Sequence, residues 1–335
     1  MAVDAGASVP SAVGVSVVMP VLNEGIHLSE AVGAILDSAY DGPIEVVLAL
    51  GPSTDDTDEV AAAIADSDAR VRLVANPSGR TASGLNAAIA SASYDIIARV
   101  DGHAVIPPDY LAVAVRTLTA TGADNVGGVM GAEGVTDFEQ AVAAAMRSWF
   151  GVGGAAFHIG GAAGPALTVY LGCFRRSALE RAGGYDETMV RAQDWELNHR
   201  IRSAGGTVWF TPELHVTYRP RATLAALARQ YFEYGRWRRE VADRYPETIS
   251  PRYLAPPVTL VAVAAGTALG LAGLVARRPR VAALGLSAPA VYAAATAVAT
   301  ARASRHLPWG VSRRLPAVFA TMHGAWGAGF LLGAR

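Results

Sequence analysis

The C-terminal part of the chain restricts its possible folds more than any other part. Two apolar runs, 258–276 and 281–301, contain no acidic or basic side chain. A third run, 315–333, contains His323. A helix of about 20 apolar residues spans the hydrocarbon core of a bilayer and satisfies its own backbone polar groups. The whole chain is 52% hydrophobic with a mean hydropathy of +0.27, and the excess lies in these runs. The sequence therefore predicts a membrane domain over 258–335.

Arginines in the connecting loops leave two interpretations of the first helical hairpin. The N-terminus, 1–13, is expected to be disordered and shows no signal-peptide pattern, so the N-terminal part is expected in the cytoplasm. The loop 302–314 would then also be cytoplasmic, and its arginines agree with the positive-inside tendency. The sequence "RRPR" at 277–280 would face outside, against that tendency. The hairpin therefore either spans the membrane or is re-entrant.

Residues 14–240 have a different pattern, and 241–257 are expected to form a juxtamembrane linker. Short apolar runs alternate with stretches of helical spacing, and four of the runs predict buried parallel strands: 15–22, 44–50, 71–76 and 95–100. This alternation predicts a doubly wound, Rossmann-like α/β sheet. Ligands of such sheets bind beyond the carboxyl ends of the strands, where four polar residues fall: Asn23, Glu24, Asp101 and His103.

Composition excludes some classes of function. The formal net charge is -1, which gives no electrostatic reason to expect nucleic-acid binding. Cys173 is the single cysteine, so no disulfide can form within the chain, and it is expected to be a core residue. The segment 151–164 contains six glycines and predicts a mobile loop near a binding cleft.

Asp101 and His103 are candidate metal ligands. Two residues that are two positions apart on an extended segment point their side chains the same way. Oxygen ligands suit Mg²⁺, and Mn²⁺ also accepts imidazole, so the pair predicts a Mn²⁺ or Mg²⁺ site facing a diphosphate. The alternative is that Asp101 caps a turn beside a surface histidine.

Asp194 is the candidate general base. It lies near the expected start of a helix at Gln193, and an ionised carboxylate can take a proton from a hydroxyl within hydrogen-bond reach. The alternative is that it stabilises the positive end of the helix dipole. Glu196, two positions later, would point elsewhere on the helix and hold the local structure.

Six motifs occur in order along the chain: "VSVVMPVLNE", "STDDT", "GLNAAI", "RVDGHA", "LGCFRRSALERAGGYDE" and "QDWELNHRI". In this order they resemble the inverting family 2 glycosyltransferases of the GT-A fold over residues 14–240. The segment "YRPRATLAALARQYFEYGRW" and the apolar tail are similar to membrane-attached enzymes that build succinoglycan-like exopolysaccharides.

The resemblance implies a role for individual residues. It assigns Asp101 and His103 to the metal motif and Asp194 to the catalytic base. Donor binding would involve Asp101 and six further residues: Pro20, Asn23, Glu24, Asp55, Arg80 and Asn86. The acceptor side would involve four residues, of which the last three are similar to a Gln-x-x-Arg-Trp motif: Glu196, Gln230, Arg236 and Trp237.

Two departures from the family pattern bear on the substrate. Leu50 stands where the family has an acid that reads the nucleotide base, so the base is not defined, although a UDP-sugar is the expected donor. Gln230 and Arg236 are six positions apart instead of three, which argues against a processive polymerase.

The apolar tail implies an acceptor at the membrane. We expect a polyprenyl- or lipid-linked sugar as acceptor, and a catalytic domain that faces the cytoplasm on the cytoplasmic membrane. An arginine cluster before the first apolar run would contact anionic headgroups or a lipid diphosphate: Arg219, Arg221, Arg229, Arg236, Arg238 and Arg239. The alternatives from other classes are a nucleotidyltransferase on the same sheet and a catalytically silent membrane scaffold.

Overall fold

The computed structural model describes residues 13–333. The expected disordered segment therefore lies outside the described residues except for Val13. Contacts divide the described chain into two compact units. Unit 1 contains residues up to 130 together with 160–217, and unit 2 contains 131–159 together with 218 onward. The sequence had assigned 131–159 and 218–240 to the first domain, so its limits at 14–240 stay a prediction.

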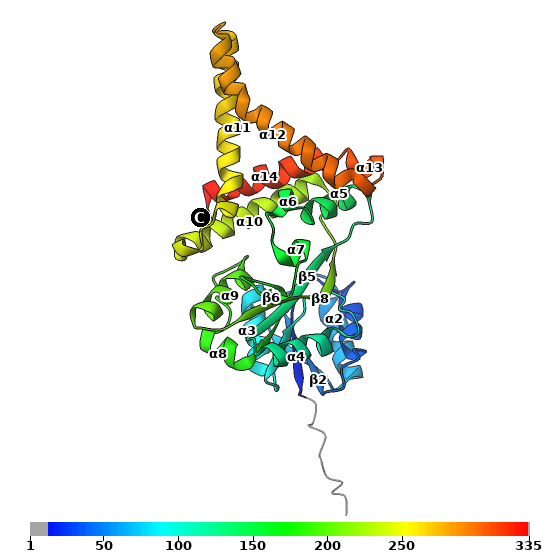
Figure 1. The fold of residues 1–335 in the computed structure, drawn as a ribbon. Helices are drawn as coiled ribbons and strands as arrows, with labels where there is room; N and C mark the ends of the chain where they lie inside the picture. Colours follow the sequence, from blue (N-terminus) through cyan, green and yellow to red (C-terminus); the bar gives the residue numbers. More distant parts are fainter. Residues whose placement is uncertain (1–12, 334–335) are drawn as a thin grey trace, which may run out of the picture. The chain divides into compact units, whose positions relative to one another are not determined.

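The first four strands of unit 1 confirm the four predicted ones. They are β1 (Val15–Val21), β2 (Ile44–Leu50), β3 (Val71–Ala75) and β4 (Ile96–Arg99), and they pair in parallel in the order β3-β2-β1-β4. The side chains of β1, β2 and β4 are almost all buried because helices cover both faces of the sheet (Figure 1). The strand β3 lies at the edge of the sheet, and Val71 is its one buried residue, so the prediction that this strand is buried is wrong.

The sheet continues with strands that the sequence did not predict. The full order is β3-β2-β1-β4-β7-β5-β8-β6, and the added strands are β5 (Asn125–Ala132), β6 (Gly164–Pro165), β7 (Tyr170–Arg175) and β8 (Val208–Tyr218). The strand β7 runs antiparallel to both β4 and β5, so the sheet is mixed. Cys173 lies on β7 and is fully buried, which raises the pKa of its thiol to about 12. This confirms that it is a core residue.

The helices of unit 1 follow the strands as the alternation indicated. They are α1 (Leu28–Leu36), α2 (Thr57–Ser67), α3 (Thr81–Ser91), α4 (Tyr110–Thr121), α8 (Arg176–Ala182) and α9 (Gln193–Ser203). The start of α9 at Gln193 confirms the predicted helix boundary. The core between helices and sheet includes Met19, Leu48 and Ile97, which have no exposed surface.

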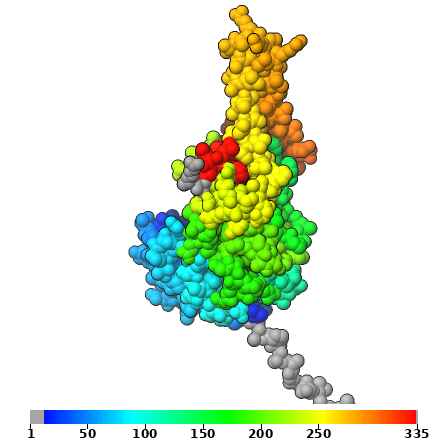
Figure 2. Space-filling view, turned by 90° about the vertical axis from the view of Figure 1, so that its left-hand side faces the viewer, coloured from blue at the N-terminus to red at the C-terminus, as the bar shows by residue number. Residues whose placement is uncertain are grey.

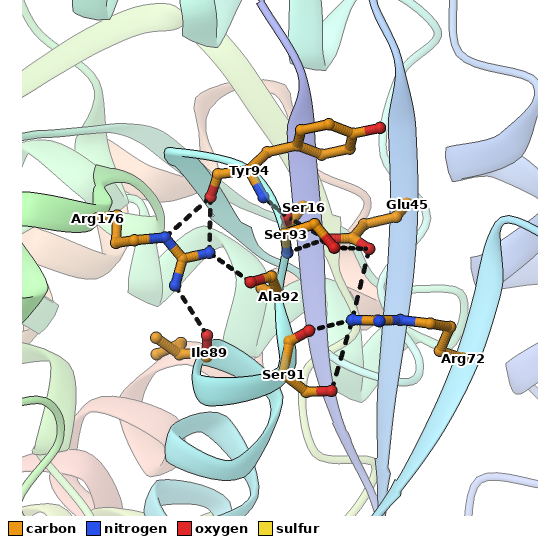
Figure 3. A network of polar contacts seen from close by, with 9 residues as sticks. All are labelled: Ser16, Glu45, Arg72, Ile89, Ser91, Ala92, Ser93, Tyr94 and Arg176. Carbon is orange, nitrogen blue, oxygen red and sulfur yellow. Dashed lines mark hydrogen bonds and ion pairs between the residues drawn. The ribbon is translucent and has the colours of Figure 1, made fainter.

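A network of charged and polar groups joins the amino-terminal ends of β1, β2 and β4 (Figure 3). Glu45 accepts a hydrogen bond from the Ser16 hydroxyl at 2.6 Å and from the Ser93 hydroxyl at 3.0 Å, and Arg72 lies 3.5 Å away. Burial alone would raise the pKa of Glu45, but these hydrogen bonds and the charge of Arg72 outweigh it and lower that pKa. Beside them, Arg176 donates to backbone carbonyls at the end of α3 and before β4.

Unit 2 is helical. After the short helices α5 (Asp137–Met146), α6 (Trp149–Val152) and α7 (Ala156–Ile159) come α10 (Leu224–Arg244), η1 (Pro246–Thr248), α11 (Pro251–Val275), α12 (Pro279–Ala303), η2 (Ser304–His306), α13 (Trp309–Ser312) and α14 (Leu315–Leu332). Three helical segments are long and apolar enough to cross a membrane: Pro251–Val275, Pro279–His306 and Trp309–Leu332. They match the three predicted runs, of which the first and third extend one residue beyond the segment, and the chain is membrane-associated.

Glycines let the long helices of unit 2 approach closely. A Cβ atom placed on Gly285 of α12 would lie 2.2 Å from the backbone nitrogen of Gly270 on α11. A Cβ atom on Gly235 of α10 would lie 2.0 Å from the carbonyl oxygen of Trp326 on α14. Such small-residue contacts are typical of helix packing in membranes. Away from them, the hairpin of α11 and α12 is largely exposed (yellow and orange in Figure 2).

The prediction of one loop over 151–164 is wrong. The segment forms the end of α6, then α7, then β6, with glycines at the breaks between them. Gly153, Gly154 and Gly160 have φ angles of 64°, 80° and 78°, a region that favours glycine. The high glycine content marks turns between short elements.

Candidate active site

The loops that follow β1 and β2 are joined by side-chain hydrogen bonds at the carboxyl end of the sheet. Asn23 has a φ of 55°, and its Oδ1 accepts a hydrogen bond from the Thr54 backbone N–H at 2.8 Å. The backbone N–H of Glu24 donates to the Thr57 hydroxyl at 2.8 Å. Asp55 accepts from the backbone N–H of Gly25 at 3.3 Å. Asn23 and Asp55 thus fix the shape of this edge.

Glu24 and His103 meet across this edge. The Nδ1 atom of His103 lies 2.7 Å from Oε1 of Glu24, so the loop after β1 contacts the loop after β4. A Cβ atom on Gly102 would lie 2.9 Å from Cγ of Glu24, so the backbone between Asp101 and His103 passes close to that side chain. The structure therefore places Glu24 beside the Asp-Gly-His segment, as the sequence implied.

Arg99, the last residue of β4, binds both the candidate metal ligand Asp101 and the candidate base Asp194. Its Nε and Nη2 atoms donate to Oδ1 of Asp101 at 3.0 Å and 2.9 Å, and its Nη1 donates to Oδ1 of Asp194. Arg99 is only 6% exposed. Burial would lower the pKa of its guanidinium, but the charges of Asp101 and Asp194 raise that pKa well above its ordinary value. One buried cation therefore holds two acids that lie 93 positions apart in the sequence.

The sequence analysis missed Arg99, although a signal was present. In "IIARVD" an arginine interrupts a buried apolar strand. A buried arginine needs an anionic partner because an unpaired buried charge is strongly unfavourable. The strand therefore indicated that carboxylates lie near its end.

Asp194 lies in the first turn of α9, after a strained residue. Ala192, the residue before the helix, has a φ of 60°, which is unusual for a residue with a side chain. Among the described hydrogen bonds, the Asp194 carboxylate binds Arg99 and caps no backbone N–H of α9. The carboxylate thus has an ionic partner outside α9, and as an acid in the first turn it also lies where the helix dipole favours a negative charge.

The environment of Asp194 affects its protonation. Its side chain is 39% exposed, yet protein surrounds it at longer range, and this burial raises the pKa of its carboxyl group. The positive charge of Arg99 opposes the rise, and the negative charge of Asp101 adds to it. A carboxylate with a raised pKa and one accessible face is suited to accept a proton.

Three predicted site residues bind other residues of unit 1. Glu196 is 1% exposed and binds Nε and Nη2 of Arg200, both at 2.7 Å, which fits the interpretation that it holds local structure. Asn86 exchanges hydrogen bonds with the backbone of Tyr185, at 2.9 Å and 2.8 Å. Arg80 donates to the carbonyl of Glu187 at 3.4 Å. Together, Asn86 and Arg80 tie α3 to the segment that leads to α9.

The remaining predicted residues divide between the units. Pro20 is the sixth residue of β1, and a Cβ atom on Gly84 of α3 would lie 3.3 Å from its Cβ. Gln230, Arg236 and Trp237 are on α10 in unit 2. Gln230 donates to the Tyr218 hydroxyl at 2.8 Å, and Arg236 donates to the carbonyl of Gly333 at 3.0 Å. Both side chains thus bind other residues of unit 2.

The sequence of the chain is similar to those of known proteins. Residues 16–182 match the model of "Glycosyl transferase family 2". The succinoglycan biosynthesis protein ExoA of Rhizobium meliloti is 32% identical over 316 residues, which cover 94% of this chain and 93% of ExoA. The chain belongs to glycosyl transferase family 2.

Solved structures show the same fold for this glycosyltransferase. The mannosyltransferase PcManGT of Pyrobaculum calidifontis, in complex with GDP-Man and Mn²⁺, aligns with a TM-score of 0.56 and 22% identity over 92% of this chain and 85% of its own. Residues 1–349 of S. aureus TarS align with a TM-score of 0.51 and 14% identity over 95% and 90%. The sheet of this chain is thus the GT-A sheet that its motifs implied.

The residues of the glycosyltransferase fit a divalent cation only as a partial ligand set. Among residues 13–333 no group of three or more His, Cys, Asp or Glu side chains is arranged to hold a metal. Asp101 uses Oδ1 for both bonds from Arg99, so Oδ2 is the oxygen that can face a cation. Mg²⁺ is commonly held by one or two carboxylates together with substrate phosphates. The expected extended segment is wrong, because residues 101–104 form a turn in which the Ala104 N–H donates to the Asp101 carbonyl at 2.9 Å. Asp101, with His103 two residues later on this turn, fits a metal whose other ligands come from the donor diphosphate.

Proposed function

We propose that this glycosyltransferase moves a sugar, with inversion, from a nucleotide-diphosphate donor to a lipid-linked acceptor in the assembly of a cell-surface polysaccharide. The observation that carries the proposal is the bridge from Arg99 to Asp101 and Asp194, because it joins the donor side of the site to the base. The similarity to a succinoglycan biosynthesis protein supports polysaccharide assembly, and the three apolar helices support an acceptor in the membrane.

In the proposed mechanism Asp194 takes the proton of the acceptor hydroxyl. The hydroxyl oxygen attacks the anomeric carbon of the donor sugar while the bond from that carbon to the diphosphate oxygen breaks on the opposite face. One displacement inverts the anomeric centre. Arg99 favours the ionised form of Asp194 against the effect of burial, because its positive charge acts to lower the pKa of that carboxyl group.

Asp101 and His103 would hold a Mn²⁺ or Mg²⁺ ion, which supplies positive charge to the departing diphosphate. Asn23, Glu24 and Asp55 shape the loops that face the nucleotide. Leu50 offers no carboxylate to the base, and a UDP-sugar is the first donor to test. We place the catalytic unit on the cytoplasmic side of the cytoplasmic membrane.

The Asp194→Asn variant tests the base. Its amide has the same shape but cannot accept the proton, so turnover should fall by about 10²–10⁴-fold while donor affinity is retained. Product formation by mass spectrometry and nucleotide affinity by calorimetry measure the two effects. If Asp194 only stabilised the helix, Asn would replace it with little change. Turnover close to wild type would therefore remove Asp194 from the mechanism.

The Asp101→Asn variant tests the metal role. We expect loss of transfer together with weaker donor binding in the presence of Mn²⁺ or Mg²⁺, because one ligand charge facing the diphosphate is lost. Donor affinity is measured with and without the cation, and chelation of the wild type is the control. An unchanged cation dependence in the variant would contradict the role of Asp101.

A further inference from the structure

Unit 2 contains a cavity of about 880 Å³ that the catalytic mechanism does not use. Residues of α6, α7, α10, α11, α12 and α14 line it, and most of its wall is aromatic or aliphatic. The large aromatic side chains in the wall are Trp149, Phe157, Tyr231, Tyr253, Tyr292 and Trp326. Voids between well-packed side chains rarely exceed the size of a water molecule, whereas small-molecule sites measure about 300–1,000 Å³. The cavity has the size of a binding site.

The wall carries a cation without an acidic partner. Arg252 lies in the first turn of α11, and within residues 13–333 no carboxylate lies within ion-pair distance of it. Its guanidinium lies 4.8 Å from the ring centre of Tyr253 and donates to the Tyr253 hydroxyl at 3.1 Å. Arg252 is half-buried in this apolar wall, and a cation that is partly removed from water is stabilised by an anionic partner. The cavity therefore has a place for a negatively charged group.

His158 supplies a second polar atom to the same wall. Its Nδ1 is inaccessible to solvent and makes no hydrogen bond to any described residue. Burial, with the nearby charge of Arg252, lowers the pKa of His158 to about 3, so its imidazole is neutral at pH 7 and can donate one hydrogen bond. An unpaired buried nitrogen beside an unpaired cation indicates a polar ligand group.

The helices that form the wall indicate the rest of the ligand. Three of them, α11, α12 and α14, belong to segments long and apolar enough to cross a membrane. A ligand among these helices comes from the bilayer, and an apolar wall with one cation fits an amphiphile with an anionic head. We propose that the cavity binds the hydrocarbon chain of a phosphate-linked polyisoprenoid that carries the acceptor sugar, with Arg252 at its phosphate. This inference rests on the lipid-linked acceptor of the proposed function.

The test uses a polyprenyl phosphate with a photoreactive group on its chain and the full-length protein in detergent. Ala262 lines the cavity on α11, and Ala264 is an exposed residue of the same helix that does not. Ala262→Phe should obstruct part of the cavity and lower labelling about tenfold, while the matched variant Ala264→Phe should label like the wild type. Mass spectrometry should find the label on peptides that line the cavity. Label elsewhere, or equal loss in both variants, would overturn the proposal.

Variants of Arg252 test the anionic head. Arg252→Gln should weaken binding of the phosphate probe by about tenfold, the scale of one hydrogen bond to a charged group, and should leave binding of the uncharged prenol unchanged. Arg252→Lys keeps the charge and should recover most of the phosphate affinity. If Arg252→Gln bound both the phosphate probe and the prenol as tightly as the wild type does, the role of Arg252 would be overturned. Competition by phosphatidylglycerol as strong as that by polyprenyl phosphate would overturn the assignment to the acceptor lipid.

Failure of this inference is distinguishable from failure of the proposed function. If the wild type transfers sugar to a lipid carrier but the label maps outside the cavity, only the cavity assignment fails. If the label maps to the cavity and follows the variants, but no lipid carrier accepts sugar, the proposed function fails and the lipid site stands.

Discussion

The two ends of the catalytic sheet each contain a buried charged group, and they are organised in opposite ways. At the amino-terminal end, one carboxylate, Glu45, is surrounded by donors from three separate segments. At the carboxyl end, one guanidinium, that of Arg99, is shared by two carboxylates. Glu45 is 12% exposed as a side chain, whereas Asp101 is 21% and Asp194 39% exposed.

This difference separates stability from function within one sheet. The Glu45 network satisfies its charge internally and joins β1, β2 and the residues before β4 (Figure 3). The Arg99 site balances one cation against two anions and keeps both anions partly accessible, so it can exchange a proton and face a cation. Ligands of open α/β sheets bind at the carboxyl ends of the strands, which agrees with this assignment.

Among variants at the two ends of the sheet, Arg99→Gln should have the largest effect, which is on turnover. We expect turnover to fall by about 10²-fold, because Asp101 and Asp194 lose the group that positions them. The positive charge of Arg99 lowers the pKa of Asp194, so its removal raises that pKa. The base is active only above its pKa, and the acid limb of the pH–rate profile should move to higher pH. A profile that keeps its wild-type position would show that Arg99 acts only on structure.

Glu45→Gln, at the amino-terminal end of the sheet, should lower stability and leave turnover unchanged. An amide cannot replace the carboxylate as acceptor for both hydroxyls, so the free energy of unfolding should fall by about 1.5–3 kcal/mol. Turnover per folded molecule should stay at the wild-type value. Arg72→Gln is the matched control: Arg72 is 43% exposed, and an exposed ion pair contributes about 0–1 kcal/mol. For both variants, thermal unfolding in detergent measures stability and initial rates measure turnover. Lost turnover in folded Glu45→Gln would contradict the separation of the two ends.

The smallest effect is the pH dependence of the Glu45 contribution. The pKa of Glu45 is lowered in the folded state, so its stabilisation is fully present above the unfolded pKa of about 4.3 and is lost as pH falls through the folded pKa. The difference in melting temperature between wild type and Glu45→Gln should be constant above about pH 5 and shrink below it. A difference that stays constant down to pH 3 would show that Glu45 is not ionised in the folded protein.

Local patterns in the sequence were enough to predict the first four strands of unit 1 and the long helices of unit 2. The apolar runs at 15–22, 44–50 and 95–100 correspond to strands, and the apolar C-terminal runs lie within the three long helices. These predictions succeed because strand and helix periodicity and bilayer length depend on neighbouring residues alone. The glycine-rich segment 151–164 was misread, since glycine at a positive φ breaks short helices as readily as it forms a loop.

The sequence by itself also determined which residue types are available for the chemistry: Asp101, His103 and Asp194 lie in motifs that are similar to those of the family. Only the tertiary structure decided that Arg99 binds Asp101 and Asp194 together, and that Glu196 is buried against Arg200. The antiparallel strand β7 and the cavity of unit 2 were also decided only there. The physical reason is that charge pairing and cavities depend on distances between segments far apart in the chain. Periodicity along the sequence carries no information about those distances.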